Sequence, residues 1–502
     1  MVAFVCAWAC AAATAEPPRD KPIWLAVTRP MFERALAPLA GHRGAEGLEA
    51  VVTTEPVERA IAKLPRPPAC ILLVGDDSDD PADAGRPWRV PVRRLPFYRW
   101  RDVQPPTFAS DAAWGDLDAD GLPDVPVGRL PVRTARELER IVAKIIAYES
   151  RPLRADDLRL SVWAGSAMYG EVVDRLANTL LLTTLKNKSP AWLEPWVLLT
   201  EASEPPDGAK GDPARAFLDQ VRRGGLMTLL IGHASRTSFA ASQTTGRWVE
   251  LTARRAEREL EQGEVASPMV IVACDTGDFV DPKARRRSWP GSAPARDATP
   301  PAAAPPTPSL GEALLLAPAG PVAVVAATTE SHPLPNAYLG RAMLDQMAHP
   351  YRRLGTWFLA AQREAAAMRD PLLEATLRDV EGKLEERIDT ARLQQDQQLT
   401  YAILGDPATR IRLPREMELA VEREQAAWRW RVVSPPSGAR VLEVGVRRPA
   451  AMPGAFEPVR PPAPDQPWQG TVTGPGVLRV LAADRQNLWV AAANLEPERK
   501  AP

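Results

Sequence analysis

The sequence predicts an α/β protein with a parallel sheet that is covered by helices, followed by a smaller β domain. Residues 226–231 and 269–273 are short apolar runs without polar alternation, which is typical of strands buried on both faces of a parallel sheet. Residues 23–149 alternate between apolar runs and helical patterns, as βαβ units do. After about residue 422, short runs separated by Pro and Gly indicate antiparallel strands. The length of 502 residues is enough for two or three domains.

The first α/β lobe is predicted over residues 20–150. Its predicted strands are residues 23–28, 50–53 and 71–74, and helical patterns near residues 32–39 and 57–63 lie between them. A longer helix is predicted over residues 134–148, where Thr134 and Glu137 have the spacing of a capping box. Its apolar face is formed by Leu138, Ile141, Val142, Ile145 and Ile146.

An acidic loop inside this lobe predicts a cation site. Positions one, three, five and nine of an EF-hand-like loop are held by Asp116, Asp118, Asp120 and Asp124, with Gly121 at position six. Alternating carboxylates around a glycine turn are ligands that calcium prefers. The twelfth position is Val127 instead of a bidentate acid, and the alternative is a turn in which the aspartates cap one another's backbone. A calcium ion here would be structural, and no cofactor is expected for catalysis.

The second α/β lobe is predicted over residues 151–415. Further strands are predicted at residues 160–165, 196–200 and 321–327, and the strands at 226–231 and 269–273 are followed closely by His233 and Cys274. In open α/β sheets, ligands lie outside the carboxyl ends of the strands, so both side chains can face one substrate. An imidazole beside a thiol favours the nucleophilic thiolate. The two residues therefore have the chemistry of a nucleophile and its base.

Each of these two residues alone has a simpler interpretation. Cysteine is among the most buried residue types, and a single histidine near a strand is more often structural. The chain has only four residues of each type, so the presence of one of each at successive strand ends is unlikely to be due to chance. Helices are predicted around these strands, near residue 171 and over residues 213–221, 248–262, 336–347, 354–368 and 372–394.

The amino terminus predicts an exported protein, and the net charge argues against a nucleic-acid partner. Residues 1–15 are apolar and small, and Ala13-Thr14-Ala15 resembles a signal peptidase site. No later run approaches the ~18 apolar residues of a membrane helix. The net charge of -1 argues against nucleic-acid binding. After removal of the signal peptide only Cys70 and Cys274 remain, so no disulfide framework is expected.

The motifs around His233 and Cys274 resemble peptidase family C25, the gingipain-type cysteine peptidases of the caspase-like clan. The resemblance lies in residues 232–235 (GHAS), 272–279 (VACDTGDF) and 309–314 (SLGEAL), which lead into 320–326. It extends to residues 72–76, 116–129, 331–337 and 404–408. The order of these motifs is kept over roughly four-fifths of the chain, which is more specific than any single motif.

This resemblance implies a caspase/gingipain-like, two-lobed parallel-sheet sandwich with helices on both faces, and the activity of a cysteine endopeptidase. Cys274 would attack the scissile carbonyl, and His233 would act as base and acid. The backbone amides of Cys274 and Ala234 would bind the oxyanion, although Ala234 stands where the family usually has glycine. Glu171 or Asp174 would orient His233, and the alternative for each is an exposed acid on a helix surface. Calcium sites are also implied.

The remaining segments are predicted as an insert and a small β domain. Arg285-Arg286-Arg287 and a Pro/Ala-rich tract form a disordered insert at residues 283–308, which is either a tolerated insertion or a processing site. Residues 420–502 are expected to form an immunoglobulin-like β sandwich. We expect a monomer with protein or peptide substrates. The alternatives on the same fold are a peptide-binding pseudoenzyme and a transpeptidase-like processing factor.

Overall fold

The computed structural model describes residues 21–96, 107–166, 171–199, 212–242, 248–280, 307–349, 351–375, 389–449, 454–463, 465–484 and 487–496. Residues 1–15, the predicted signal peptide, lie outside the described residues. So do residues 283–306 of the predicted insert, including its three arginines.

A ten-stranded sheet forms the centre of the molecule, in the order β2-β1-β3-β6-β15-β14-β13-β9-β7-β8. The strands of the first lobe are β1 (Ile23–Val27), β2 (Glu49–Thr53), β3 (Cys70–Val74) and β6 (Val127–Leu130). The others are β7 (Arg159–Ala164), β8 (Glu194–Leu199), β9 (Met227–Ile231), β13 (Met269–Val272), β14 (Val324–Ala327) and β15 (Tyr401–Leu404). The α/β fold class predicted from the sequence is confirmed, but the sheet is mixed rather than wholly parallel.

The two lobes share this one sheet, and its halves run in opposite directions. β15 is antiparallel to β14, where Ala327 is in register with Tyr401, but it is parallel to β6 on its other side. The other pairs in the sheet are parallel. The amino ends of β6 and β15 therefore lie at the same sheet edge as the carboxyl ends of β13 and β14. The acidic loop precedes β6, so it too approaches that edge.

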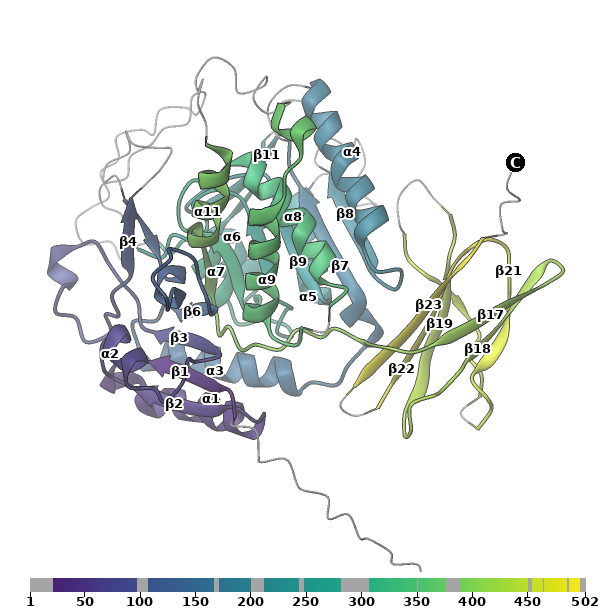
Figure 1. Ribbon diagram of the computed structural model, residues 1–502, viewed down its shortest axis with the longest axis horizontal. Helices are drawn as coiled ribbons and strands as arrows, with labels where there is room; N and C mark the ends of the chain where they lie inside the picture. Colours follow the sequence, from purple (N-terminus) through teal and green to yellow (C-terminus); the bar gives the residue numbers. More distant parts are fainter. Residues whose placement is uncertain are drawn as a thin grey trace, which may run out of the picture.

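Helices cover both faces of the sheet, as Figure 1 shows for α8 and α9 in front of the strands. One face packs against α1 (Glu33–Ala45), α3 (Ala135–Ser150), α5 (Pro213–Arg223), α6 (Ala253–Glu259) and α7 (Leu310–Leu316). The other packs against α2 (Val57–Ala62), α4 (Glu171–Lys188), α8 (Pro333–Gln346) and α9 (Leu354–Ala367). A further helix, α11 (Thr390–Thr400), contacts α8 and α9. The predicted capping box of Thr134 and Glu137 is present at the start of α3.

The segment between His233 and Cys274 differs from the prediction of a single helix over residues 248–262. Its first part is β12 (Trp248–Thr252), which pairs with β11 (Ser238–Ser242), and only α6 is helical. Together with β10 (His233–Ser235), these strands form a separate antiparallel sheet of three strands. Phe239 and Leu251 bury this small sheet against the main core. Of the helix predicted over residues 372–394, residues 376–388 lie outside the described residues, residues 371–375 are helical, and α11 continues beyond the prediction to Thr400.

The motif at residues 404–408 joins the end of the second lobe to the first. The Asp406 carboxylate is fully buried and accepts hydrogen bonds from Trp24 Nε1 at 3.1 Å and Arg43 Nε at 2.7 Å. Arg43 is also paired with Glu149 at 2.7 Å. Burial in low dielectric makes such charges costly unless they are paired, so this cluster fixes how the two lobes meet.

The carboxyl-terminal strands form a separate β unit, seen at the right of Figure 1. Its five-stranded sheet contains β16 (Arg415–Glu416), β19 (Arg440–Arg447), β20 (Glu457–Val459), β22 (Gly476–Ala483) and β23 (Leu488–Leu495). Its three-stranded sheet contains β17 (Leu419–Glu424), β18 (Ala427–Val432) and β21 (Gln469–Thr473). Trp430, Val444 and Leu478 share one core, so the two sheets are packed together. The immunoglobulin-like topology stays a prediction.

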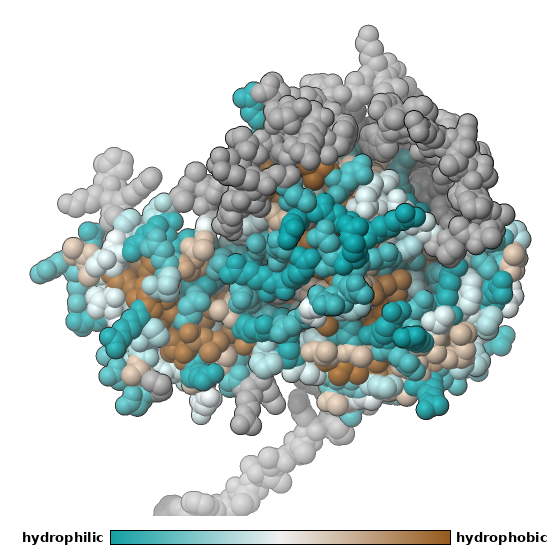
Figure 2. Space-filling view, turned by 180° about the vertical axis from the view of Figure 1, so that it is seen from behind, coloured by the Kyte–Doolittle hydropathy of each residue, from teal (hydrophilic) through white to brown (hydrophobic). Residues whose placement is uncertain are grey.

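The β unit contacts the α/β unit at the residues just before β8. Arg479 donates to the Trp192 carbonyl at 3.1 Å, and Arg447 donates to the Leu193 carbonyl at 2.7 Å. Seen from behind, the surface is mainly polar with several apolar patches (Figure 2). Within the described ranges, no helix is both long and apolar enough to cross a membrane.

Candidate active site

The register of the central strands brings together the residues that follow β7, β9 and β13. Ile231 pairs with Ala164 on one side and with Val272 on the other, and all three strands are parallel. The pairing continues one residue further, since the Gly165 amide donates to the Ile231 carbonyl at 2.8 Å and the Gly232 amide to the Val272 carbonyl at 3.2 Å. His233 and Cys274 are therefore level with each other at one sheet edge. The prediction that their strands are parallel neighbours is confirmed.

Cys274 lies in a tight turn at this edge. Asp275 has a positive φ of 58°, and the Asp278 amide donates to the Asp275 carbonyl at 3.0 Å. The turn is anchored to the segment after β14, because the Asp275 amide donates to the Thr329 carbonyl at 3.0 Å. A non-glycine residue in the left-handed region is uncommon and requires support from its surroundings. This backbone fixes the position of the thiol.

The surroundings of the thiol favour its protonated form. Burial raises the pKa of Cys274 to about 12, and the neighbouring carboxylates of Asp275 and Glu330 act in the same direction. Hydrogen bonds from Ser331 oppose this and lower the pKa. Because the nucleophile is the thiolate, the site needs donors or a cation beside the sulfur, and an imidazolium at position 233 would supply one.

Gly277 lets the Cys274 turn lie directly against β14. A Cβ atom at this position would be 2.5 Å from the Ala326 carbonyl oxygen and 2.8 Å from its carbon. Both atoms belong to a buried strand that cannot move without disturbing the sheet. The glycine of this motif is therefore required by the close approach of two backbones.

Gly277→Ala is expected to lower the free energy of unfolding by about 1–3 kcal/mol, the usual cost of overpacking, and to reduce any activity of Cys274. Gly340→Ala is a matched control, because position 340 lies in α8 with no atom within 4 Å of the added Cβ. That control should be neutral or gain about 0.5–1 kcal/mol. Urea unfolding of both variants measures the difference. Equal stability of the two variants would contradict this account of the turn.

His233 begins the hairpin of β10 and β11, and Arg236 attaches this hairpin to the Cys274 turn. Arg236 Nε donates to the Asp278 carbonyl at 2.9 Å, and the Leu310 amide donates to the Arg236 carbonyl at 2.7 Å. Its guanidinium also lies 3.5 Å from the Glu312 carboxylate. Arg236, in the turn next to the GHAS motif, was not predicted as a site residue from the sequence. Its contacts link the two halves of the candidate site.

Ala234 is in register with Phe239, and its side chain is buried. The hairpin closes on Ser235 and Ser238 through the two-residue turn Arg236-Thr237. In such hairpins the closing pair is hydrogen-bonded, and antiparallel pairs then alternate. Ala234 and Phe239 accordingly form a non-hydrogen-bonded pair. The Ala234 amide then points away from β11.

Of the two candidate acids, Asp174 is buried, with 6% of its surface exposed, and it accepts a hydrogen bond from the Ser166 hydroxyl. Ser166 follows β7 by two residues and is level with His233 at the sheet edge. The alternative of an exposed surface acid is thus wrong for Asp174. Glu171 is the first residue of α4.

The acidic loop brings three carboxylates together. Oxygen atoms of Asp116, Asp118 and Asp120 all lie within 4.8 Å of one another. Asp118 and Asp120 each accept a backbone amide two residues on, and Asp116 accepts the Gly121 amide at 3.0 Å. The second oxygen of Asp116 is buried and has no hydrogen-bond partner among the described residues. Asp124 is turned elsewhere and accepts the Leu117 amide at 2.9 Å.

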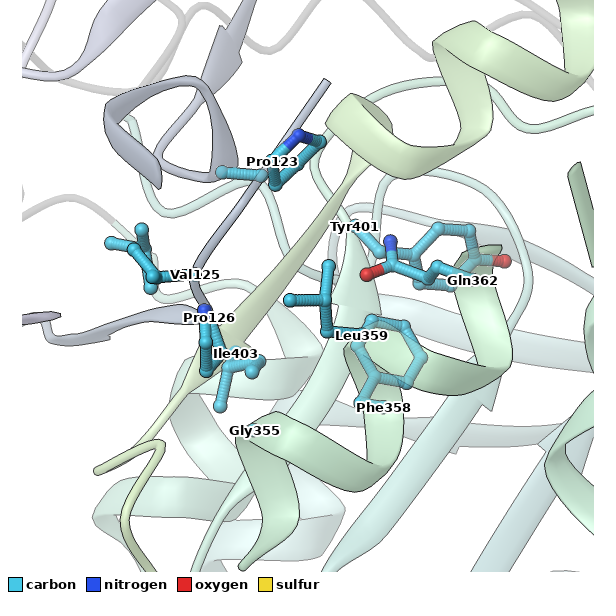
Figure 3. Close-up of a pocket in the computed structure, with 11 residues that line it drawn as sticks. Pro123, Val125, Pro126, Gly355, Phe358, Leu359, Gln362, Tyr401 and Ile403 are labelled. Atoms are coloured by element: carbon cyan, nitrogen blue, oxygen red, sulfur yellow. The ribbon is translucent and has the colours of Figure 1, made fainter. Parts of the chain in front are cut away.

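A small apolar pocket separates the acidic loop from α9 and β15 (Figure 3). Pro123, Val125 and Pro126 line one side, while Phe358 and Leu359 lie opposite, with Tyr401 deeper in the pocket. The pocket is at the same sheet edge as Cys274, but Cys274 does not line it. This pocket is therefore distinct from the candidate site at the strand ends.

Comparison with known proteins identifies the family. The model of peptidase family C25 matches residues 18–412. The crystal structure of gingipain R (RgpB), an Arg-specific cysteine proteinase, is 15% identical with a TM-score of 0.54, and the match covers 96% of this chain and 99% of that one. The complex of the Porphyromonas gingivalis RgpB pro- and mature domains is 14% identical with a TM-score of 0.53, covering 94% and 100%. No curated protein matches.

At these identities the solved structures establish the fold, while the family model covers most of the chain, including the motifs around His233 and Cys274. Members of this family are cysteine peptidases that act on proteins. The chain belongs to peptidase family C25.

Proposed function

We propose that the chain is an exported cysteine endopeptidase in which Cys274 is the nucleophile and His233 is its base and acid. The observation that carries the proposal is the register of β9 and β13, which makes the two residues neighbours at the carboxyl edge of the sheet. Each residue follows its strand by only two positions, and groups held close to the rigid ends of adjacent strands keep their mutual geometry better than residues on long loops. The substrates are proteins or peptides, and the enzyme acts as a monomer.

In this mechanism His233 takes the thiol proton, and the Cys274 sulfur attacks the scissile carbonyl carbon. The carbonyl oxygen becomes an oxyanion, which the amides of Cys274 and Ala234 stabilise. The alternation in the β10–β11 hairpin supports this role, because it leaves the Ala234 amide without a cross-strand acceptor. His233 then gives its proton to the leaving amine, and a thioester remains. Water attacks the thioester, His233 accepts its proton, and the sulfur leaves as the second product is released.

Asp174 is the acid that we propose as the positioning residue for His233. An imidazole that must exchange protons on one nitrogen needs an acceptor for the other. The supporting observations are the burial of Asp174 and its hydrogen bond from Ser166, which is level with His233. Glu171 is the second candidate, one helical turn earlier. The Arg specificity of gingipain R belongs to that protein and is not proposed here.

The proposal is tested by incubating the purified protein with a mixed peptide library under reducing conditions and reading the products by mass spectrometry. Cleaved peptides with free carboxyl ends, absent with Cys274→Ala, support an endopeptidase. Products joined to an added amine nucleophile would identify a transpeptidase. Peptide binding without turnover by either protein would identify a pseudoenzyme.

We also propose that the acidic loop binds one calcium ion for stability. Three clustered carboxylates and the unpaired, buried oxygen of Asp116 suit a hard cation. The hydrogen bonds to backbone amides are compatible with this, because each aspartate retains a second oxygen. The ion would stabilise the loop that leads into β6, and it would take no part in bond cleavage.

Calcium is expected to raise the temperature of thermal unfolding, and chelation to lower it. At a calcium concentration of 100 times Kd, the linkage contributes about 2.7 kcal/mol. Asp116→Asn should lose most of this calcium-dependent shift, whereas Asp219→Asn should keep it, because Asp219 is an exposed residue of α5. Differential scanning fluorimetry with and without EGTA measures the effect. The same unfolding temperature in calcium and in EGTA would mean that the loop binds no calcium and is only a turn capped by its aspartates.

A further inference from the structure

Ser331 provides the hydrogen-bonding contacts that the structure gives for the Cys274 sulfur. The Ser331 amide donates to Sγ at 3.5 Å, and the Ser331 hydroxyl lies 3.8 Å from Sγ. In the thiol form, Sγ donates to the Ser331 carbonyl at 3.7 Å. Ser331 is only 9% exposed and comes from the segment between β14 and α8. One residue therefore faces the sulfur with two donors and one acceptor.

Asn336 determines the direction of the Ser331 hydroxyl. The Asn336 side-chain oxygen accepts two hydrogen bonds, from the Tyr401 hydroxyl at 2.9 Å and from Gln397 Nε2 at 2.8 Å. With its oxygen engaged on that side, the Asn336 amide group points the other way and donates to Ser331 Oγ at 2.8 Å. Ser331 Oγ is thus an acceptor toward Asn336. A hydroxyl has a single hydrogen, and two acceptors remain for it, the Cys274 sulfur and the Tyr401 hydroxyl oxygen, which also contacts Ser331. A thiolate, as the charged acceptor, attracts this hydrogen more strongly than the neutral Tyr401 hydroxyl.

The members of this network come from three elements and are held rigidly. Asn336 is in α8, Gln397 is in α11, and Tyr401 begins β15. Gln397 and Tyr401 are 4% and 2% exposed. In a low-dielectric interior, a fully satisfied network of this kind is strong and has one preferred arrangement. The position of the Ser331 hydroxyl oxygen is therefore set before any substrate arrives.

We propose that Ser331 is a positioning residue that donates two hydrogen bonds to the Cys274 thiolate, and that Asn336, held by Tyr401 and Gln397, orients the Ser331 hydroxyl for this purpose. The role rests on the proposed function, in which Cys274 must become a thiolate. The two hydrogen bonds from Ser331 offset the effect of the Asp275 and Glu330 carboxylates, which disfavour a negative charge on the sulfur. His233, which begins β10 and is level with Cys274, supplies the proton acceptor. Ser331 supplies hydrogen-bond donors that do not exchange protons.

The test measures the second-order rate of alkylation of Cys274 by iodoacetamide as a function of pH, with peptide mapping to separate Cys274 from other cysteines. Ser331→Ala should move the midpoint of this profile upward by about one pH unit, because the thiolate loses a donor. Ser331→Thr keeps the hydroxyl and should restore the midpoint. Tyr401→Phe should shift it in the same direction by a smaller amount, since Asn336 keeps Gln397.

A purely structural role for Ser331 predicts a different result. In that case Ser331→Ala would lower the unfolding temperature and leave the midpoint of alkylation unchanged. An unchanged or lower midpoint in Ser331→Ala, or a wild-type midpoint in Tyr401→Phe, would overturn the proposal. Alkylation does not require peptide hydrolysis. If no peptide is cleaved, the proposed function fails. The pH profile of alkylation still shows whether Ser331 donates hydrogen bonds to the Cys274 thiolate.

Discussion

Cys274→Ala is expected to lower kcat/KM for peptide hydrolysis by at least about 10³-fold, with the fold unchanged. Alanine removes the sulfur that forms the thioester, and the other cysteine among the described residues, Cys70, is buried in β3. The residue is partly exposed at the end of β13, so its loss leaves no deep cavity. The rates are compared on the same peptide, chosen from the cleaved members of the library.

Cys70→Ala is the matched control for this experiment. Cys70 begins β3, is 4% exposed, and burial raises the pKa of its thiol above the usual range. A thiol in this environment is inert. This variant should keep wild-type kcat/KM, although it loses some stability from the smaller side chain. Loss of activity in Cys70→Ala with retention in Cys274→Ala would mean that the catalytic thiol has been wrongly assigned.

The second large effect is expected for Arg129→Ala, which should lower the free energy of unfolding by about 3–5 kcal/mol. Arg129 is fully buried in β6 and makes two hydrogen bonds to the Asp111 carboxylate, at 2.6 and 2.7 Å. It also donates to the carbonyls of Gly75 and Val90, each at 2.8 Å. Its guanidinium lies 4.7 Å from the centre of the Phe279 ring. The truncation leaves a buried carboxylate without its counter-ion.

Arg136→Ala is the control, because Arg136 is an exposed residue of the same type on α3. Its effect should stay within about 0.5 kcal/mol. Arg129→Lys should recover only part of the loss, since an ammonium cannot make the paired contacts of a guanidinium. Denaturant unfolding of the three variants gives the comparison. A loss below about 1 kcal/mol in Arg129→Ala would contradict this assignment of the buried pair.

The main strands of the fold could be predicted because their sequences are locally distinctive. The runs before His233 and Cys274 are apolar throughout, and a buried parallel strand is the simplest structure for them. β12 was missed because residues 248–252 precede a charged helix, and the helical pattern was extended over both. β15 was missed because only three residues separate α11 from the motif at 404–408.

Only those residues of the candidate site that belong to short sequence motifs could be predicted. His233, Cys274 and the acid candidates are each marked by local sequence. Ser331 lies 57 residues beyond Cys274 in the chain. Tyr401 is brought near Ser331 by β15, which is antiparallel to β14. Such contacts depend on sheet register and on the antiparallel junction of β14 and β15. The motif at residues 331–337 was visible in the sequence, but its role follows only from the three-dimensional contacts.

The central claim, that Cys274 is a peptidase nucleophile activated by His233, is tested most directly by covalent trapping. The protein is incubated with a mixture of peptidyl acyloxymethyl ketones under reducing conditions, and intact mass and peptide mapping give the extent and position of labelling. We predict one adduct per chain, on Cys274, which is absent from Cys274→Ala and forms at least about tenfold more slowly in His233→Ala. Absence of an adduct on Cys274, or equal labelling rates with and without His233, would contradict the claim.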